Sequence, residues 1–158
     1  MNATELQALR RLLFLTQQEA ASMLAGVSHR AWVHWEAGAR PVPEDVAAAI
    51  RELAEHRETM LDEALAAFQA GDDHARAEGS SEDDIDRAEL RLVWYASPTD
   101  WTGEPLHWFA HRSALAGLCA MDDRVRLVPF DGRSYAAWLG AREDSQSMRA
   151  AWANEVTL

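Results

Sequence analysis

The stretch that decides the fold is TQQEAASMLAGVSHRAWVHWEAGARPVP, residues 16–43. Thr16 and Glu19 have the spacing of a capping box, in which the hydroxyl and the carboxylate satisfy two free backbone N–H groups. A helix is therefore expected directly after Thr16. Gly26 suits the turn that ends this helix, and Ser28 suits the cap of a second helix. The sequence predicts two short helices joined by a glycine-containing turn.

The second of these helices, residues 28–37, has two different faces. Trp32 and Trp35 lie three positions apart and share the inner face, where paired aromatic side chains usually belong to a core. The opposite face carries His29, Arg30, Val33 and His34. A short helix that exposes such groups beside a preceding helix is what reading the major groove of DNA requires.

Residues on this face, and two residues beside it, have expected roles in contacting DNA. An arginine in the first turn, Arg30, can donate both arms of its guanidinium to guanine O6 and N7, which is worth roughly 1–3 kcal/mol of discrimination. Gln17 at a helix N-terminus and Arg40 beyond the second helix suit phosphates of the backbone. The predicted DNA-binding residues are Gln17, Ser28, His29, Arg30, Val33, His34 and Arg40.

Three patterns in the deciding stretch resemble the helix-turn-helix signature of lambda-repressor-like (Xre-type) DNA-binding domains. These are T-Q-x-E-A-A at 16–21, G-V-S at 26–28 and W-E-x-G-x-R at 35–40. The match is specific, because caps, turn and aromatic spacing all occur in the same order.

Flanking segments make the resemblance closer. ELQALRRLL (5–13), VPEDV (42–46) and LHWFAHRSALAGL (106–118) are similar to the YdiL-like group that includes the second class of anti-CRISPR-associated autorepressors. The resemblance covers roughly residues 2–120. It implies a five-helix N-terminal DNA-binding domain, a C-terminal α/β segment that pairs two chains, and repression of the protein's own operon. It also implies RNA binding for some relatives, which leaves no distinct mark in this sequence.

The composition limits which partners the chain attracts. The 158 residues contain 15 Lys+Arg against 26 Asp+Glu, a net charge of −11, so uniform attraction to nucleic acid or to an anionic membrane is not expected. Residues 1–41 differ, with four arginines against three glutamates. Any anion-binding surface is therefore local, and this segment is where we expect it.

Cysteine and hydropathy patterns indicate the compartment. Cys119 is the single cysteine, which leaves no intramolecular disulfide or cysteine-rich zinc site and fits a reducing compartment. The first residues lack the features of a signal peptide, and no apolar run reaches the ~18 residues that span a bilayer. We expect a soluble, cytoplasmic protein.

Beyond the deciding stretch, the pattern predicts an α+β protein. Residues 43–70 carry apolar residues at helical spacing, and Arg57 interrupts this stripe at the point where a break in the helix is expected. Residues 71–89 hold eight acids and two arginines around one large apolar residue, Ile85, which indicates a solvated linker. Strands are expected at 91–95, 106–109 and 125–130, and helices at 113–121 and around Trp138.

These expectations define four segments. They are a helix-turn-helix DNA-binding domain (1–70), the acidic linker (71–89), a small α/β dimerisation segment (90–132) and a C-terminal helical extension (133–158). Within the dimerisation segment, an apolar interface is expected from Val93, Trp94, Trp108 and Phe109.

The interpretation that follows is a sequence-specific transcriptional regulator that binds an inverted-repeat operator as a homodimer. No catalytic residue, metal or cofactor is assigned: His107 and His111 lack the third ligand of a metal site, and Cys119 lies on an apolar helix face. Alternatives are an antitoxin whose C-terminal half holds a toxin protein, and a regulator whose Trp-rich C-terminal half senses a ligand. The weakest alternative is an enzyme tethered to a DNA-binding module, because no nucleophile and base are paired there.

Overall fold

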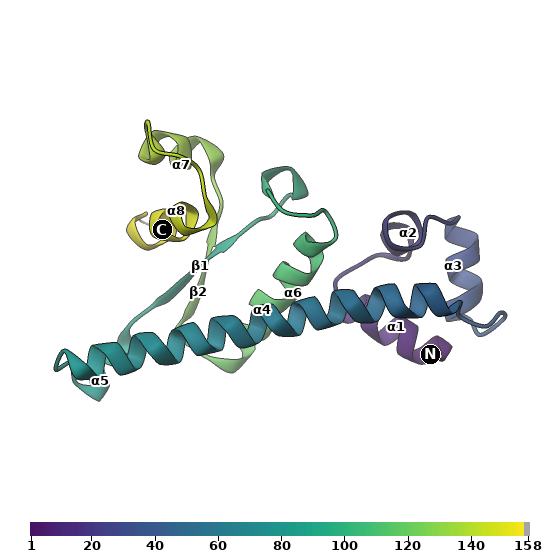
Figure 1. Ribbon diagram of the computed structural model, residues 1–158, viewed down its shortest axis with the longest axis horizontal. Coiled ribbons are helices and arrows are strands. Elements are labelled where there is room, and N and C mark those ends of the chain that lie inside the picture. Colours follow the sequence, from purple (N-terminus) through teal and green to yellow (C-terminus); the bar gives the residue numbers. More distant parts are fainter. Residues whose placement is uncertain (157–158) are drawn as a thin grey trace. The chain divides into compact units, whose positions relative to one another are not determined.

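The computed structural model describes residues 1–156 of the chain. It is a mixed α+β structure, mostly helical, with a two-stranded sheet (Figure 1), which confirms the predicted fold class. The chain divides into two compact units that are not consecutive in sequence. The first unit contains residues 1–60 and 103–114, and the second contains residues 61–102 and the chain from residue 115 onward. Two helices, α4 and α6, therefore contribute residues to both units.

The first unit is built from helices. These are α1 (Ala3–Leu12), α2 (Gln17–Glu19) with its π-helical continuation η1 (Ala20–Leu24), α3 (His29–Glu36), and the first parts of α4 (Glu44–Ala77) and α6 (His107–Met121). Its core consists of buried apolar side chains from α1, η1, α3, α4 and α6, together with the residue that follows α1: Leu6, Leu13, Ala20, Trp32, Trp35, Val46, Ile50, Trp108 and Phe109. The two helices predicted within residues 16–43 are confirmed.

Figure 1 shows α4 as one continuous helix. It has 34 residues and includes Arg57 without a break. The expected break at Arg57 is wrong. Its side chain is buried, and its Nε donates a hydrogen bond of 2.9 Å to the hydroxyl of Ser113. A buried guanidinium with a partner does not interrupt a helix, because its polar group is satisfied by a neighbouring element.

The second unit contains a parallel pair of strands and short helices. In chain order these are α5 (Glu82–Arg87), β1 (Leu90–Trp94), the 3-10 turn η2 (Pro98–Asp100), β2 (Val125–Pro129), α7 (Gly132–Leu139) and α8 (Gln146–Glu155). Strand β1 pairs with β2 in parallel, in a register that runs from Leu90 opposite Val125 to Trp94 opposite Pro129. The core beside the sheet is formed by Leu61, Leu115, Leu118 and Val125.

The strand expected at 106–109 is wrong, because His107 begins helix α6. The aromatic residues Trp108 and Phe109 suggested a strand, yet both are buried on a helix. Parallel strands cannot be joined by a tight turn and need a crossover of about a dozen residues or more, usually a helix. α6 is that crossover between β1 and β2.

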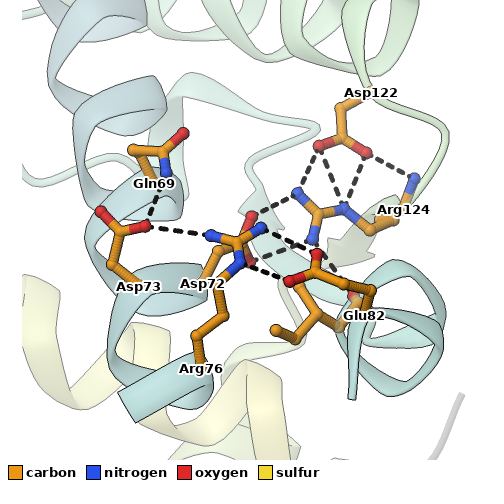
Figure 2. A network of polar contacts seen from close by, with 8 residues as sticks. Gln69, Asp72, Asp73, Arg76, Glu82, Asp122 and Arg124 are labelled. Atoms are coloured by element: carbon orange, nitrogen blue, oxygen red, sulfur yellow. Dashed lines mark hydrogen bonds and ion pairs between the residues drawn. The ribbon is translucent and has the colours of Figure 1, made fainter. Parts of the chain in front are cut away.

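Most side chains of the acidic stretch 71–89 are exposed, as expected of a solvated segment, but most of the stretch is helical, so its interpretation as a linker is wrong. Residues 71–77 continue α4, and residues 82–87 form α5, on which Ile85 is buried. Two arginines bind its acids (Figure 2): Arg124 donates to Asp72 at 3.0 Å, and Arg76 donates to Glu82 at 2.8 Å. These ion pairs, together with one buried isoleucine, help to offset the conformational entropy that is lost when a segment with so few apolar residues is ordered.

The C-terminal segment that begins at residue 133 is helical as predicted, although residues 157 and 158 lie outside the described part. It is part of the second unit and not an appendage, because α8 inserts the buried Arg149 among groups of that unit. Arg149 donates to the carboxylate of Asp144 at 2.7 Å and to the carbonyl of Asp100 at 2.7 Å. Its guanidinium also lies 4.7 Å from the ring centroid of Phe130, a cation–π contact.

The apolar interface expected from four residues of the segment 90–132 needs correction. Val93, Trp108 and Phe109 are buried within the chain itself, and Trp94 packs against the core beside the sheet. These side chains therefore do not form a free surface for a second copy.

Among residues 1–156, no helix has both the length and the apolar character needed to cross a membrane.

Candidate nucleic-acid interface

The first helix of the candidate site begins as the sequence predicted. The Thr16 hydroxyl accepts a hydrogen bond of 3.1 Å from the backbone N–H of Glu19, whose carboxylate accepts one of 2.8 Å from the N–H of Thr16. The helix continues from α2 into η1, where the buried Ala20 and Ala21 leave room for close packing. Gly26, with φ +61°, then makes the turn.

Helix α3 follows the turn, and its inner face holds it in place. The Ser28 hydroxyl caps it by accepting a hydrogen bond of 3.3 Å from the N–H of Ala31. Trp32 and Trp35 are both buried, with their rings 5.8 Å apart in an edge-to-face arrangement. The prediction that these tryptophans belong to the core is confirmed.

The outer face of α3 carries the predicted DNA-reading side chains. His29 and Arg30 are exposed, whereas Val33 and His34 are half-buried. Arg40 is exposed in the segment after the helix, where its backbone N–H donates to the carbonyl of His34. Within residues 1–156, the side chains of His29, Arg30, His34 and Arg40 make no hydrogen bond or ion pair. Their donors are therefore available to a ligand.

Gln17 differs from the other predicted residues because its side chain is already engaged. It is half-buried at the first position of α2, and its Nε2 donates a hydrogen bond of 2.8 Å to the carboxylate of Glu36 on α3. The other N–H of the amide has no partner within residues 1–156, and the phosphate contact of Gln17 stays a prediction. This residue joins the two helices of the candidate site as well.

The structure reveals a buried ion pair behind the site that the sequence reasoning missed. Arg10 on α1 donates to Glu36 from its Nε at 2.5 Å and from its Nη2 at 3.1 Å, and its Nη1 donates to the carbonyl of Leu15 at 2.8 Å. The signal was present, because Leu6, Arg10 and Leu13 share one helical face. An arginine on that apolar face indicates a buried partner.

Glu36 is the centre of this network. Its side chain is 2% exposed and also accepts a hydrogen bond of 2.7 Å from the indole N–H of Trp32. Burial alone would raise the pKa of Glu36, but the hydrogen bonds from Arg10, Gln17 and Trp32 outweigh it and lower the pKa to about 2. Glu36 is therefore an anion at neutral pH, and it fixes α3 against both α1 and α2.

The two histidines considered for a metal lie within the first unit. His107 stacks on His56 with ring centroids 3.8 Å apart. Burial lowers the pKa of His111 to about 4, so this residue is neutral at physiological pH. In the part of the chain that the structure describes, no three histidine, cysteine or acidic residues are grouped to hold a metal ion.

Comparisons with known proteins agree on one family. The family model described as Aca2/YdiL-like matches residues 1–127. A curated relative, the Aca2 repressor of Pectobacterium phage ZF40, is 44% identical over 61 residues, which are 39% of this chain and 53% of the relative. The chain thus spans about half the length of this relative, and the family match includes all of the candidate site.

Proposed function

The chain belongs to the Aca2/YdiL-like family, and on that premise we propose that it is a sequence-specific DNA-binding repressor. It acts as a homodimer on an inverted-repeat operator and represses its own operon by occluding the promoter. The repressor role is supported by the name of the relative from phage ZF40. Membership in this family also supports a role as a regulator.

The observation that carries this proposal is the difference between the inner face of α3, which is packed, and its outer face, whose donors are free within residues 1–156. Its inner face is fixed by Trp32, Trp35 and Glu36, while its outer face presents donors with no partner in the described chain. A rigid helix with a free outer face meets the main requirement of major-groove recognition, since bases are read by side chains held in one register.

The predicted contacts divide into two kinds. Arg30 reads a guanine, and His29, Val33 and His34 contact neighbouring base edges, thymine methyl groups or phosphates. Gln17 and Arg40 position the protein on the phosphates, and Ser28, which caps α3, is the remaining predicted contact. Residues 1–41 carry a net charge of only +1, from four arginines and three glutamates, so the phosphate contacts are few. Binding specificity therefore depends mainly on contacts with the bases.

Dimerisation supplies the additional DNA contacts that a single pair of helices, α2 and α3, lacks. A single copy of α3, the helix proposed to read DNA and called the reading helix below, contacts too few bases for tight and selective binding. A second copy of the protein on the same DNA roughly doubles the contacts. Two-fold symmetry then requires half-sites about one helical turn apart, or a multiple of it. We place the pairing surface in the segment 90–132, outside the side chains that the fold buries.

The experiment that tests this function is selection of DNA from a random pool by the full chain, followed by affinity measurements at several salt concentrations. We expect an inverted repeat, a dimer in sedimentation, and a shallow slope of log affinity against log salt. Strong binding to random duplex at physiological salt, or one monomer bound to a site without symmetry, would contradict the proposal.

A further inference from the structure

Helix α6 completes the first unit from a distant part of the sequence. Two consecutive residues of α4 hold it: His56 stacks on His107, and Arg57 donates to the hydroxyl of Ser113 at 2.9 Å. Residues 103–114 thus belong to the same compact unit as α1–α3. The candidate DNA-binding unit is therefore not contained in the first 70 residues.

Ser113 is the polar centre of this attachment. It is 3% exposed, and its hydroxyl accepts from Arg57 and donates to the carbonyl of Leu12, which lies 101 positions earlier in the chain. One small side chain thereby joins the Nε of the buried Arg57, whose Nη1 also donates to Glu58 at 2.6 Å, to the last carbonyl of α1. Removing the hydroxyl leaves Nε of Arg57 without a partner in a buried environment, and it breaks the bond that joins α6 to the carbonyl of Leu12.

The same last turn of α1 is also bound to the reading helix. Arg10 lies two positions before Leu12 and binds Glu36 at the end of α3. The final turn of α1 is therefore held by α6 through Leu12 and holds α3 through Arg10. A displacement of this turn changes the geometry of Glu36, and with it the hydrogen bond from Trp32.

We propose that Ser113 is a positioning residue for DNA recognition, which sets the orientation of α3 through the last turn of α1. This inference rests on the proposed function and adds that a segment assigned to dimerisation completes the DNA-reading unit. Because α6 continues into residues of the second unit, the reading helix depends on a helix that the two units share.

The test compares Ser113→Ala and Ser113→Thr in the full chain, with Ser147→Ala as a matched loss of an exposed hydroxyl. Operator affinity is measured per folded molecule, with the folded fraction taken from circular dichroism. The indole N–H resonance of Trp32, assigned by Trp32→Phe, reports the position of α3 in solution without DNA. We expect Ser113→Ala to shift this resonance and to weaken operator binding about threefold to tenfold. The Thr variant restores both readouts.

The outcomes separate the two proposals. A variant Ser113→Ala that melts earlier but keeps the Trp32 resonance and the affinity per folded molecule would show a purely structural role and overturn the inference. Failure of Ser113→Thr to restore the resonance would assign the effect to packing and would overturn it as well. If the unmodified chain selects no operator, the proposed function fails, while the Trp32 resonance still decides whether Ser113 positions α3.

Discussion

Arg10 on α1 and Glu36 on α3 lie 26 positions apart in sequence and form a buried ion pair, with Nε of the arginine 2.5 Å from Oε1 of the glutamate. The pair joins the first helix of the chain to the helix proposed to read DNA. Because Gln17 and Trp32 donate to the same carboxylate, α1, α2 and α3 meet at one buried charge. The rigidity of the candidate interface therefore depends on a residue that does not itself face DNA.

Removing this charge is predicted to destabilise the chain strongly. Glu36→Gln leaves the Arg10 guanidinium buried without its counterion, and breaking a buried pair in this way costs about 3–5 kcal/mol. Urea denaturation of the full chain measures the effect, with Glu63→Gln on an exposed position of α4 as the control. A loss no larger than that of the control would show that Glu36 does not stabilise the unit.

The same carboxylate predicts a dependence of stability on pH. The pKa of Glu36 falls from 4.5 to about 2 on folding, so its contribution is fully present above about pH 4.5 and is lost as the pH falls towards 2. The difference in unfolding free energy between the unmodified chain and Glu36→Gln is therefore expected to be constant from pH 7 to 5 and to shrink at lower pH. A difference that grows on acidification would contradict the assignment.

The sequence predicted local structure around residues 16–43 well. Thr16, Ser28 and Gly26 act through the backbone within a few residues, so their roles as caps and turn can be read from spacing alone. The burial of Trp32 and Trp35 follows in the same way from helical periodicity. What could be predicted of the site is thus the part that neighbouring residues determine.

The parts that could not be predicted depend on distant partners. The sequence predicted a break in the helix at Arg57 because the partner of this residue, Ser113, lies 56 positions away. The acids of 71–89 looked like a solvated linker because Arg124, which binds Asp72, comes more than thirty residues after that stretch ends. Composition reports charge within a segment, and it does not show which distant arginine neutralises that charge.

The order of the acidic stretch is predicted to depend on Arg124. This side chain binds Asp72 and Asp122 (Figure 2), and it also donates to the carbonyl of Ile85 at 3.2 Å. Arg124→Gln removes these charge-assisted bonds, so we expect amides of α5 to exchange with solvent about tenfold faster or more. Hydrogen-exchange mass spectrometry measures this, with the more exposed Arg126→Gln as the control. Unchanged protection of residues 82–87 would show that Arg124 does not order them.

Substitutions on the two faces of α3 are predicted to have different effects, one on operator specificity and the other on stability. Arg30 is exposed and has no partner in the described chain, so Arg30→Ala should change the unfolding free energy by no more than about 0.5 kcal/mol. It should nevertheless relax operator specificity by roughly 1–3 kcal/mol, because the guanine contact is lost. Trp35→Ala instead opens a cavity in the core and should cost about 3–5 kcal/mol of stability.

Thermal melting and competition binding against single-base variants of the operator measure the two effects separately. Loss of binding by Trp35→Ala is expected to follow the loss of folded protein, because this side chain lies behind the interface. If Arg30→Ala keeps full specificity while a fully folded Trp35→Ala loses it, the recognition face lies on the opposite side of α3. In that case the tryptophans, and not the outer residues, would be the groups that read DNA.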